Sequence, residues 1–489
     1  MIFKFRHNRP LTIPVPRAES PIVPVPIESK FSDLAIPGIY VASSIPRDER
    51  QTAALLFCRL QAWLARTFSP MQKGLARVDA DPEVALRTAY TSGHRKCWPA
   101  PLRPGAYDGE VDLGHLAVAS PYACYLQKDT GGSFRWDLTS LDQFESQAGL
   151  RRPSALVEFT FDGSSKFPVA TRIDCELGSS SPGDADWSEA QRIAMCALST
   201  HLSLVRHFNW IHLVCGDPLA LETRNFLPVN HPIRRLLQPH VYATQSSDQM
   251  VTIVQMNKGG DFENTYGLTH AGICNLFEAT RTDFDLRLIN PVFDADIRGL
   301  AAAPFETPAF DNRLAIMKVI RDHVARYLAL YYDSDEALAK DESFSPWLEV
   351  LRRRIPHGVG EIAGAKVTIK GAVDLLATFI YLTTVEHEIV DSGVWNYQLW
   401  SDVQPSRVYA NGQRMPLDVY QRMVSANFNF QIPRTPLMSD FTSLALDAKG
   451  AGAFQSFLRD LGGLQRVMDV EPAACWRIEP RNLKANINA

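Results

Sequence analysis

The chain has 489 residues, of which 46% are hydrophobic, 10% aromatic and 21% charged, and its formal net charge is −4 at pH 7. This composition excludes an intrinsically disordered protein, because it supplies ample apolar material for a buried core. The small negative net charge gives no sign of the basic surface that binds nucleic acids, so we expect no nucleic acid partner. No apolar run approaches ~18 residues, and we therefore expect no transmembrane segment.

The N-terminal region and the cysteines indicate the compartment. Residues 1–16 alternate basic, polar and proline residues and lack the apolar run of a signal peptide. The eight cysteines are scattered, with no CxxC pair, which is typical of reduced thiols. We expect a cytoplasmic protein that acts as a monomer or a homodimer.

Seven prolines lie between residues 8 and 38. Because proline fixes φ and has no backbone N–H, they predict an extended arm over residues 1–44, wrapped on the body and without regular structure. Residues 45–489 form one domain in our interpretation. Apolar residues at helical spacing predict helices over residues 52–67, 187–214, 315–332 and 373–390, and hence a mainly α fold.

One stretch, residues 154–176, reads as a β-hairpin instead. Leu156 and Phe159 precede the turn sequence Asp162-Gly163-Ser164, and Val169 follows it. Alternating apolar residues around such a turn predict two short strands. We expect this hairpin to be a local insert in a large helical bundle.

Five of the 12 histidines fall between positions 201 and 240. Neutral imidazoles are good metal ligands, so His207 and His212 are candidates for half of a metal site. Positions five apart differ by ~140° in an α-helix and share no face, whereas a π-bulge would bring them into line. The alternative is that they are ordinary histidines on a partly buried helix.

The structural alternative is our interpretation for the other three histidines, His201, His231 and His240. Pro232 and Pro239 bracket residues 233–238, and a residue before proline is disfavoured in helical conformation. His231 and His240 should therefore lie at helix boundaries, where they can cap or bind loop carbonyls.

A second candidate half-site is His387 with Asp391. These residues are four apart, ~40° around a helix, so both side chains could reach one metal ion. Glu388 lies off that face. The alternative is a helix end with solvated charges before Gly393, and the spacing alone leaves both open.

Several motifs, in order along the chain, resemble those of the lipoxygenase family. They are Ile45-Pro46-Arg47-Asp48-Glu49, Asp184 to Ala190 around Trp187, His231 to His240, Tyr331 to Glu336 followed by Trp347, and the helix from Phe379 to Val390. The histidine run is the most specific of them. The resemblance implies a helical catalytic domain whose long central helices carry the metal ligands. It also implies a minimal form, since we see no room for the family's amino-terminal β-sandwich.

Carried over residue by residue, the family's metal ligands fall on His207, His212 and His387, and on the terminal carboxylate of Ala489. The family's remaining side-chain ligand is usually Asn, His or Ser, and here that position is Asp391. The resemblance implies one non-haem iron per chain, although manganese accepts the same nitrogen and carboxylate ligands. A second carboxylate should make the site more anionic and stabilise the ferric state.

The resemblance also predicts the substrate pocket. Counting from His240 without gaps, Val251 stands where the family has a small Ala or Gly, and Gln255 where it has a leucine. Phe262, Thr265 and Tyr266 would line the deep end. Val251 would crowd the oxygen side, while the Gln255 amide needs hydrogen-bond partners that a hydrocarbon cannot give.

The function implied is that of a dioxygenase acting on an apolar substrate and O2. In the family, a ferric hydroxide takes a hydrogen atom from a polyunsaturated fatty acid or similar diene, and O2 adds to the resulting radical. Two alternatives stay open. One keeps the fold and metal but oxidises a non-fatty-acid metabolite or isomerises a hydroperoxide, and the other is a non-catalytic apolar-ligand binding protein.

Overall fold

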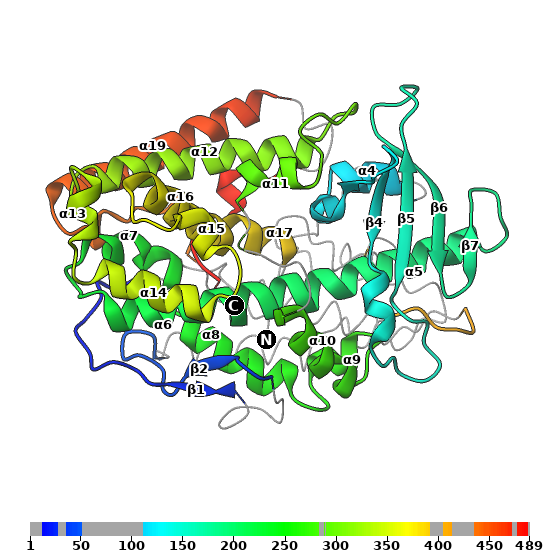
Figure 1. Ribbon diagram of the computed structural model, residues 1–489, viewed down its shortest axis with the longest axis horizontal. Helices are drawn as coiled ribbons and strands as arrows, with labels where there is room; N and C mark the ends of the chain where they lie inside the picture. The colour runs from blue at the N-terminus through cyan, green and yellow to red at the C-terminus, as the bar shows by residue number, and fades with distance from the viewer. Residues whose placement is uncertain are drawn as a thin grey trace, which may run out of the picture.

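The computed structural model describes residues 12–27, 36–50, 111–282, 288, 290–391, 404–412, 435–471 and 477–487 of the chain. They form a mainly helical body with a small antiparallel sheet at one end (Figure 1). The predicted mainly α fold is confirmed. The helix predicted over residues 52–67 lies outside the described residues.

The first long helical run passes through the middle of the body. It consists of α5 (Trp187–Thr200), η6 (His201–Gly216) and α6 (Asp217–Phe226), and the backbone stays helical at both junctions. The segment η6 is a π-helix in which every residue except Arg206 and Phe208 is buried. A helix that is buried on all sides belongs to the core. The predicted helix over 187–214 is confirmed, with a π-helical second half.

The second run consists of α16 (Ile369–Tyr381), η8 (Leu382–Glu386) and α17 (His387–Val390), where η8 is again π-helical. The Thr383 and Thr384 hydroxyls donate to the carbonyls of Phe379 and Ile380 at 3.0 and 2.6 Å. Such bonds compete with the backbone ladder and favour local irregularity. The predicted helix over 373–390 is therefore present with one π turn.

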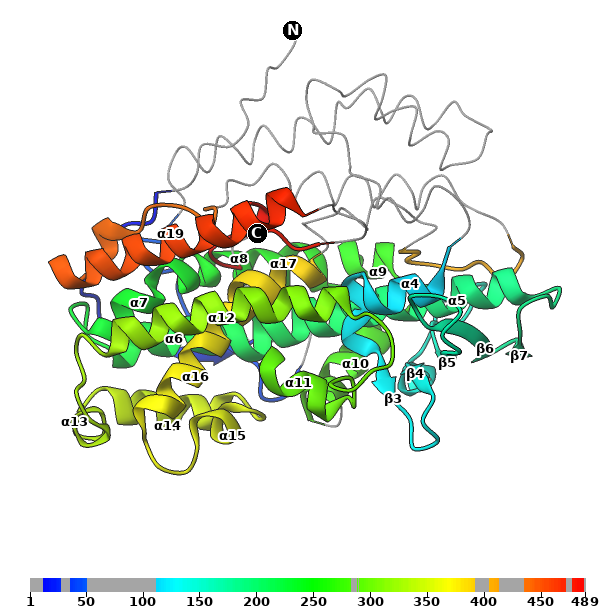
Figure 2. The same cartoon turned by 90° about the horizontal axis from the view of Figure 1, so that it is seen from above.

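Other helices pack around these two runs. The predicted helix over 315–332 is α12 (Pro308–Leu328), which packs against α16 and lies alongside α19 (Ala448–Val470) (Figure 2). The helix α7 (Pro232–Val241) begins with His231 as its N-cap and continues through Pro239. His231 and His240 lie at the ends of α7 as predicted, but Pro239 does not end it. The remaining helices are α4 (Leu113–Val118), η4 (Pro121–Tyr125), η5 (Thr139–Gln143), α8 (Thr244–Val251), η7 (Thr252–Met256), α9 (Asp261–Thr265), α10 (His270–Thr282), α11 (Pro291–Ile297), α13 (Asp335–Ala339), α14 (Phe344–Arg354), α15 (Val359–Ala363), η10 (Thr442–Leu444) and η11 (Pro480–Asn482).

The predicted hairpin forms the centre of a larger sheet. Strands β5 (Ala155–Thr160) and β6 (Val169–Cys175) pair antiparallel, and β3 (Gln127–Lys128), β4 (Phe134–Asp137) and β7 (Gly178–Ser180) complete the order β3-β4-β5-β6-β7. In β5 the side chains of Ala155, Val157 and Phe159 are buried, so one face lies on the core. The sequence did not reveal the outer strands because each has only two to four residues.

The N-terminal segment runs along the body. Strand β1 (Pro24–Pro26) pairs antiparallel with β2 (Tyr40–Ala42), and β2 contacts α6 and α8. We predicted no regular structure here, and β1 corrects that expectation, since prolines are tolerated in an edge strand. Asn225 of α6 fixes the segment by accepting from the N–H of Ile22 and donating to its carbonyl, both at 2.9 Å.

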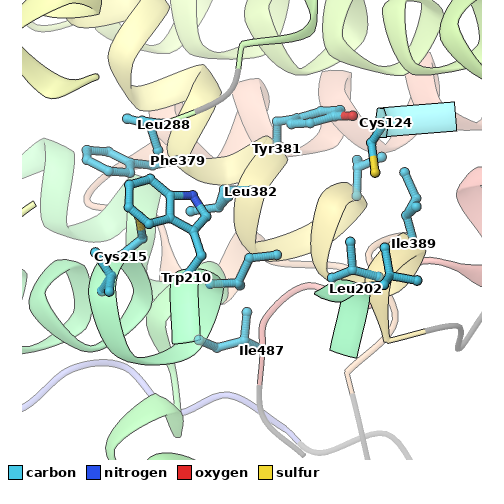
Figure 3. Packing of buried hydrophobic residues seen from close by; sticks show 14 of the residues in the cluster. Cys124, Leu202, Trp210, Cys215, Leu288, Phe379, Tyr381, Leu382, Ile389 and Ile487 are labelled. Atoms are coloured by element: carbon cyan, nitrogen blue, oxygen red, sulfur yellow. The ribbon is translucent and has the colours of Figure 1, made fainter. Parts of the chain in front are cut away.

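The core joins the two helical runs to the C-terminal segment. Figure 3 shows Trp210 of η6, Phe379 and Leu382 of the second run and Ile487 near one another. All four side chains are at most 2% exposed. Among the described residues, no helix is long and apolar enough to cross a membrane.

Candidate metal centre

Three histidines meet in the core where the two helical runs approach each other. The Nε2 atoms of His207 and His387 lie 3.1 Å apart, those of His207 and His212 3.3 Å, and those of His212 and His387 3.2 Å. The three residues are at most 2% exposed. Two elements from distant parts of the sequence thus bring three imidazole nitrogens to one point.

The π-helix explains how His207 and His212 share a face. Hydrogen bonding from residue i to i+5 aligns side chains five positions apart, which an α-helix separates. The π-helical geometry that their spacing required is present over the whole of η6. A second π turn, η8, directly precedes His387.

The nitrogen triangle fits a metal ion. Two imidazole nitrogens each ~2.1 Å from one metal lie about 3.0–3.4 Å apart at bond angles between about 90° and 109°, which brackets the observed separations. Hydrogen bonds cannot replace the ion. A hydrogen bond needs one nitrogen that donates and one that accepts. Among three Nε2 atoms at least two are of the same kind, so that pair faces each other without a hydrogen bond. Burial also lowers the pKa of His387, which favours the neutral form that binds metals.

Asp391 extends this group with a carboxylate. Its Oδ1 lies 3.7 Å from Nε2 of His207, and the residue is 5% exposed. Its backbone N–H donates to the carbonyl of His387 at 2.8 Å, which holds it one helical turn beyond that histidine. The side chain therefore faces the histidine cluster, and the histidines with Asp391 form a group that could bind a metal.

Two further carboxylates contact the outer nitrogens of the histidines, and sequence reasoning missed both. Oδ1 of Asp248 on α8 lies 2.9 Å from Nδ1 of His212, and Oε1 of Glu388 lies 3.5 Å from Nδ1 of His387. We placed Glu388 off the ligand face, and in the structure its carboxylate lies on the Nδ1 side of the His387 ring. Carboxylates in such positions orient metal-binding imidazoles. No local signal in the sequence links Asp248 to a histidine 36 positions away.

The electrostatics of Asp248 depend on the ion. Burial raises the pKa of Asp248 well above its usual range. A cation bound to Nε2 of His212 would counteract this increase in the pKa of Asp248. It uses the lone pair of Nε2 and so leaves the imidazole proton on Nδ1, where it faces the Asp248 carboxylate.

The C-terminal segment enters the same region. Ala485, Asn486 and Ile487 are at most 1% exposed. His240 donates from Nδ1 to the carbonyl of Ala485 at 2.8 Å, and Asn486 donates to the carbonyl of Pro239 at 3.0 Å. Ile487 packs against Gly216, four residues beyond His212, where a Cβ would come within 2.4 Å of its Cδ1. Ala489, the predicted carboxylate ligand, lies outside the described residues.

The predicted pocket residues fall into two groups. The ring of Phe262 lies 4.3 Å from that of Phe208, which stacks on His212 at 5.7 Å. Tyr266 is buried beside Phe262, with ring centroids 6.5 Å apart, and Thr265 lies between them at the end of α9. This aromatic group therefore adjoins the histidines.

The other predicted pocket residues, Val251 and Gln255, lie at the junction of α8 and η7. The Val251 side chain lies outside the described part of the structure. Oε1 of Gln255 is buried and accepts no hydrogen bond from the described residues. The substrate-binding role of all five residues stays a prediction.

The three histidines that we interpreted as structural make specific contacts elsewhere. Nδ1 of His201 lies 2.9 Å from the Tyr125 hydroxyl, and Nε2 of His231 lies 3.0 Å from Oδ2 of Asp341. Burial lowers the pKa of His240 to about 4, so it is a neutral donor to the C-terminal segment.

Comparisons with known proteins show which proteins the chain resembles. No protein-family model matches it. Over 219 residues it is 28% identical to linoleate 9S-lipoxygenase 2 of Oryza sativa subsp. japonica, a match to 42% of this chain and 25% of that protein. Over 266 residues it is 23% identical to arachidonate 12-lipoxygenase, 12R-type, of Mus musculus, a match to 52% of this chain and 37% of that protein. The matched stretch is thus well under half of each relative.

Solved structures share the fold over nearly the whole chain. Coral 8R-lipoxygenase superposes with a TM-score of 0.76 at 16% identity, covering 92% of this chain and 78% of that one. A manganese lipoxygenase superposes with a TM-score of 0.75 at 16% identity, covering 96% of this chain and 95% of that one. The chain shares the fold of these lipoxygenases and is similar in sequence to lipoxygenases over 42% to 52% of its length. The resemblance inferred from its motifs is confirmed.

Proposed function

We propose that this protein is a non-haem metal dioxygenase that inserts O2 into a polyunsaturated fatty acid or a similar diene. The observation that carries the proposal is the buried triangle of Nε2 atoms from His207, His212 and His387. The names of its relatives, a linoleate and an arachidonate lipoxygenase, support the substrate class.

In this proposal, the three histidines and Asp391 hold one iron or manganese ion, and the carboxylate of Ala489 joins them. The burial of Ala485–Ile487 and the contact of Ile487 with Gly216 support the last ligand, because they bring the C-terminal segment toward the π-helix. When bound, the metal supplies the one-electron chemistry that removes a hydrogen atom from the activated carbon between two double bonds.

The protein's own residues orient and enclose the centre. Asp248 fixes the ring of His212 through Nδ1, so that its Nε2 stays directed inward, and Glu388 lies 3.5 Å from Nδ1 of His387, on the side of the ring away from Nε2. Phe208 and Phe262 cover the histidines with apolar surface, which suits a hydrocarbon chain and excludes water. Asp391 adds negative charge, which stabilises the oxidised metal.

The test combines metal analysis with oxygen uptake. We expect one iron or manganese per chain, and oxygen uptake with conjugated-diene formation on linoleate but not on oleate, which has no carbon between two double bonds. His212→Ala should lose metal and uptake together. His115→Gln, a histidine outside the cluster, should retain both. A protein with a full complement of metal but no uptake on any polyunsaturated acid would contradict the fatty-acid proposal.

A second candidate keeps the metal but changes the substrate to an oxygenated diene or a hydroperoxide. The buried Oε1 of Gln255 favours it, because an acceptor without a donor in the described part of the chain would be satisfied by a substrate hydroxyl. Hydroxylated and hydroperoxy dienes, assayed beside linoleate, separate the two. With the second candidate, Gln255→Leu should lower turnover of the oxygenated substrate and leave linoleate unaffected.

A further inference from the structure

We propose that a second cavity, separate from the metal centre, binds a small carboxylate with an apolar body on the guanidinium of Arg206. The cavity has a volume of about 620 Å³, which lies in the range of small-molecule sites. Its walls come from η4, β4, η6, α11 and α15, at the end of the body near the sheet.

The cavity opens on a different face of η6 from the metal centre. Arg206 and His201 both line it, whereas His207 and His212 do not. In a π-helix, residues five apart fall in line, so 201 with 206 and 207 with 212 form two rows offset by roughly a quarter of a turn. The same helix thus presents one row to the metal centre and the other to this cavity.

Within the described part of the chain, Arg206 is a cation without a carboxylate partner. Among the described residues, no Asp or Glu oxygen lies within the 4.0 Å that defines an ion pair with it. Its contacts are with the Tyr125 ring, 4.8 Å from the guanidinium carbon, and the carbonyl of Cys124, 3.4 Å from Nη2. The guanidinium is half-buried and no described carboxylate contacts it, so an anionic ligand would add a direct ion pair.

The other charges that line the cavity are already engaged. Arg298 pairs with Asp294 at 2.5 Å. Asp137 accepts from Thr139, through its N–H at 3.2 Å and its hydroxyl at 2.7 Å, and Glu361 accepts from the N–H of Gly358 at 2.8 Å. None of these lining acids forms an ion pair with Arg206, so its guanidinium is the group to which an anion would bind.

The rim of the cavity selects the rest of the ligand. Phe293 and Ile297 of α11 line it and are 46% and 55% exposed, so an apolar surface borders the half-buried cation. A guanidinium matches a planar carboxylate through two parallel hydrogen bonds. A carboxylate joined to a short aromatic or alkyl body satisfies both features.

The experiment measures thermal unfolding with 4-phenylbutyrate as the probe and 4-phenylbutyramide as its uncharged match. We expect the carboxylate, but not the amide, to raise the Tm of the full chain in a saturable manner. Arg206→Gln should weaken binding of the carboxylate at least ~tenfold, because it removes a charge-assisted contact. Arg172→Gln, at an exposed position on β6, should bind like the parent. His212→Ala should also bind, since the cavity does not use the metal centre.

The unliganded protein gives a second readout. If Arg206 served only the fold, Arg206→Gln would lower the Tm, whereas removing a ligand-binding cation that no described carboxylate contacts should leave the Tm unchanged or raise it. Arg206→Lys, which keeps the charge but not the planar fork, should bind with intermediate affinity. The proposal is overturned if Arg206→Gln binds the carboxylate as tightly as the parent, if both probes act alike, or if no saturable shift occurs.

Discussion

The contact between Asp248 and His212 should set the metal affinity. Its Nδ1 to Oδ1 distance of 2.9 Å is that of a charge-assisted hydrogen bond, worth roughly 1.5–3 kcal/mol. At about 1.4 kcal/mol per tenfold, this predicts that Asp248→Ala lowers metal affinity by roughly 10–150-fold. Asp248→Asn keeps an oxygen acceptor but loses the charge, so its loss should be smaller.

The assay is competition for iron or manganese against a chelator of known affinity, with unfolding of the metal-free protein measured in parallel. Burial raises the pKa of Asp248, which means that its charge opposes folding of the metal-free chain. Asp248→Asn should therefore weaken metal binding without lowering the stability of the metal-free protein. Asp374→Asn, which alters a buried acid paired with Arg321 at 2.7 Å and away from the histidines, is the control. Equal metal affinities of parent, Asp248→Asn and Asp248→Ala would refute the reasoning.

Three further predictions concern the C-terminal segment, acid stability and the metal's redox poise. Gly216→Ala would place a Cβ 2.4 Å from Ile487, so we expect a denaturant titration to show a loss of roughly 1–3 kcal/mol in the free energy of unfolding, together with faster metal release. The control is Gly452→Ala, which has open space around it and should be neutral or stabilising in the same titration. Burial lowers the pKa of His323 to about 3, so below pH ~6.5 the unfolded chain binds a proton that the folded chain excludes, and the free energy of unfolding decreases as the pH is lowered. His323→Phe should reduce the slope of that decrease by about 1.4 kcal/mol per pH unit. An unchanged slope between pH 6 and 4 would count against this prediction. Asp391→Asn removes a negative charge at the centre and should raise the metal's reduction potential by about 60 mV or more in a redox titration, whereas an unaltered potential would mean that Asp391 does not face the metal.

The sequence predicted the parts of the centre that depend on local spacing and on family motifs. Apolar periodicity located both central helical runs, and His387 with Asp391 at a separation of four could be placed on one face. The spacing of His207 and His212 also indicated that they could share a face only in a π-helix, and this segment is π-helical in the structure.

Only the tertiary structure could decide which groups face the histidines from other elements. Asp248 reaches His212 because α8 packs against η6, and Ile487 reaches Gly216 because the C-terminal segment is threaded into the core. Neither contact follows from spacing along the chain. The same holds for Arg206, an ordinary charged residue in the sequence, which is seen to lack a carboxylate partner among the described residues only once the surrounding elements are in place. The local sequence determines which side chains share a face of one helix. Which side chains of other helices they contact across the core depends on how the helices pack.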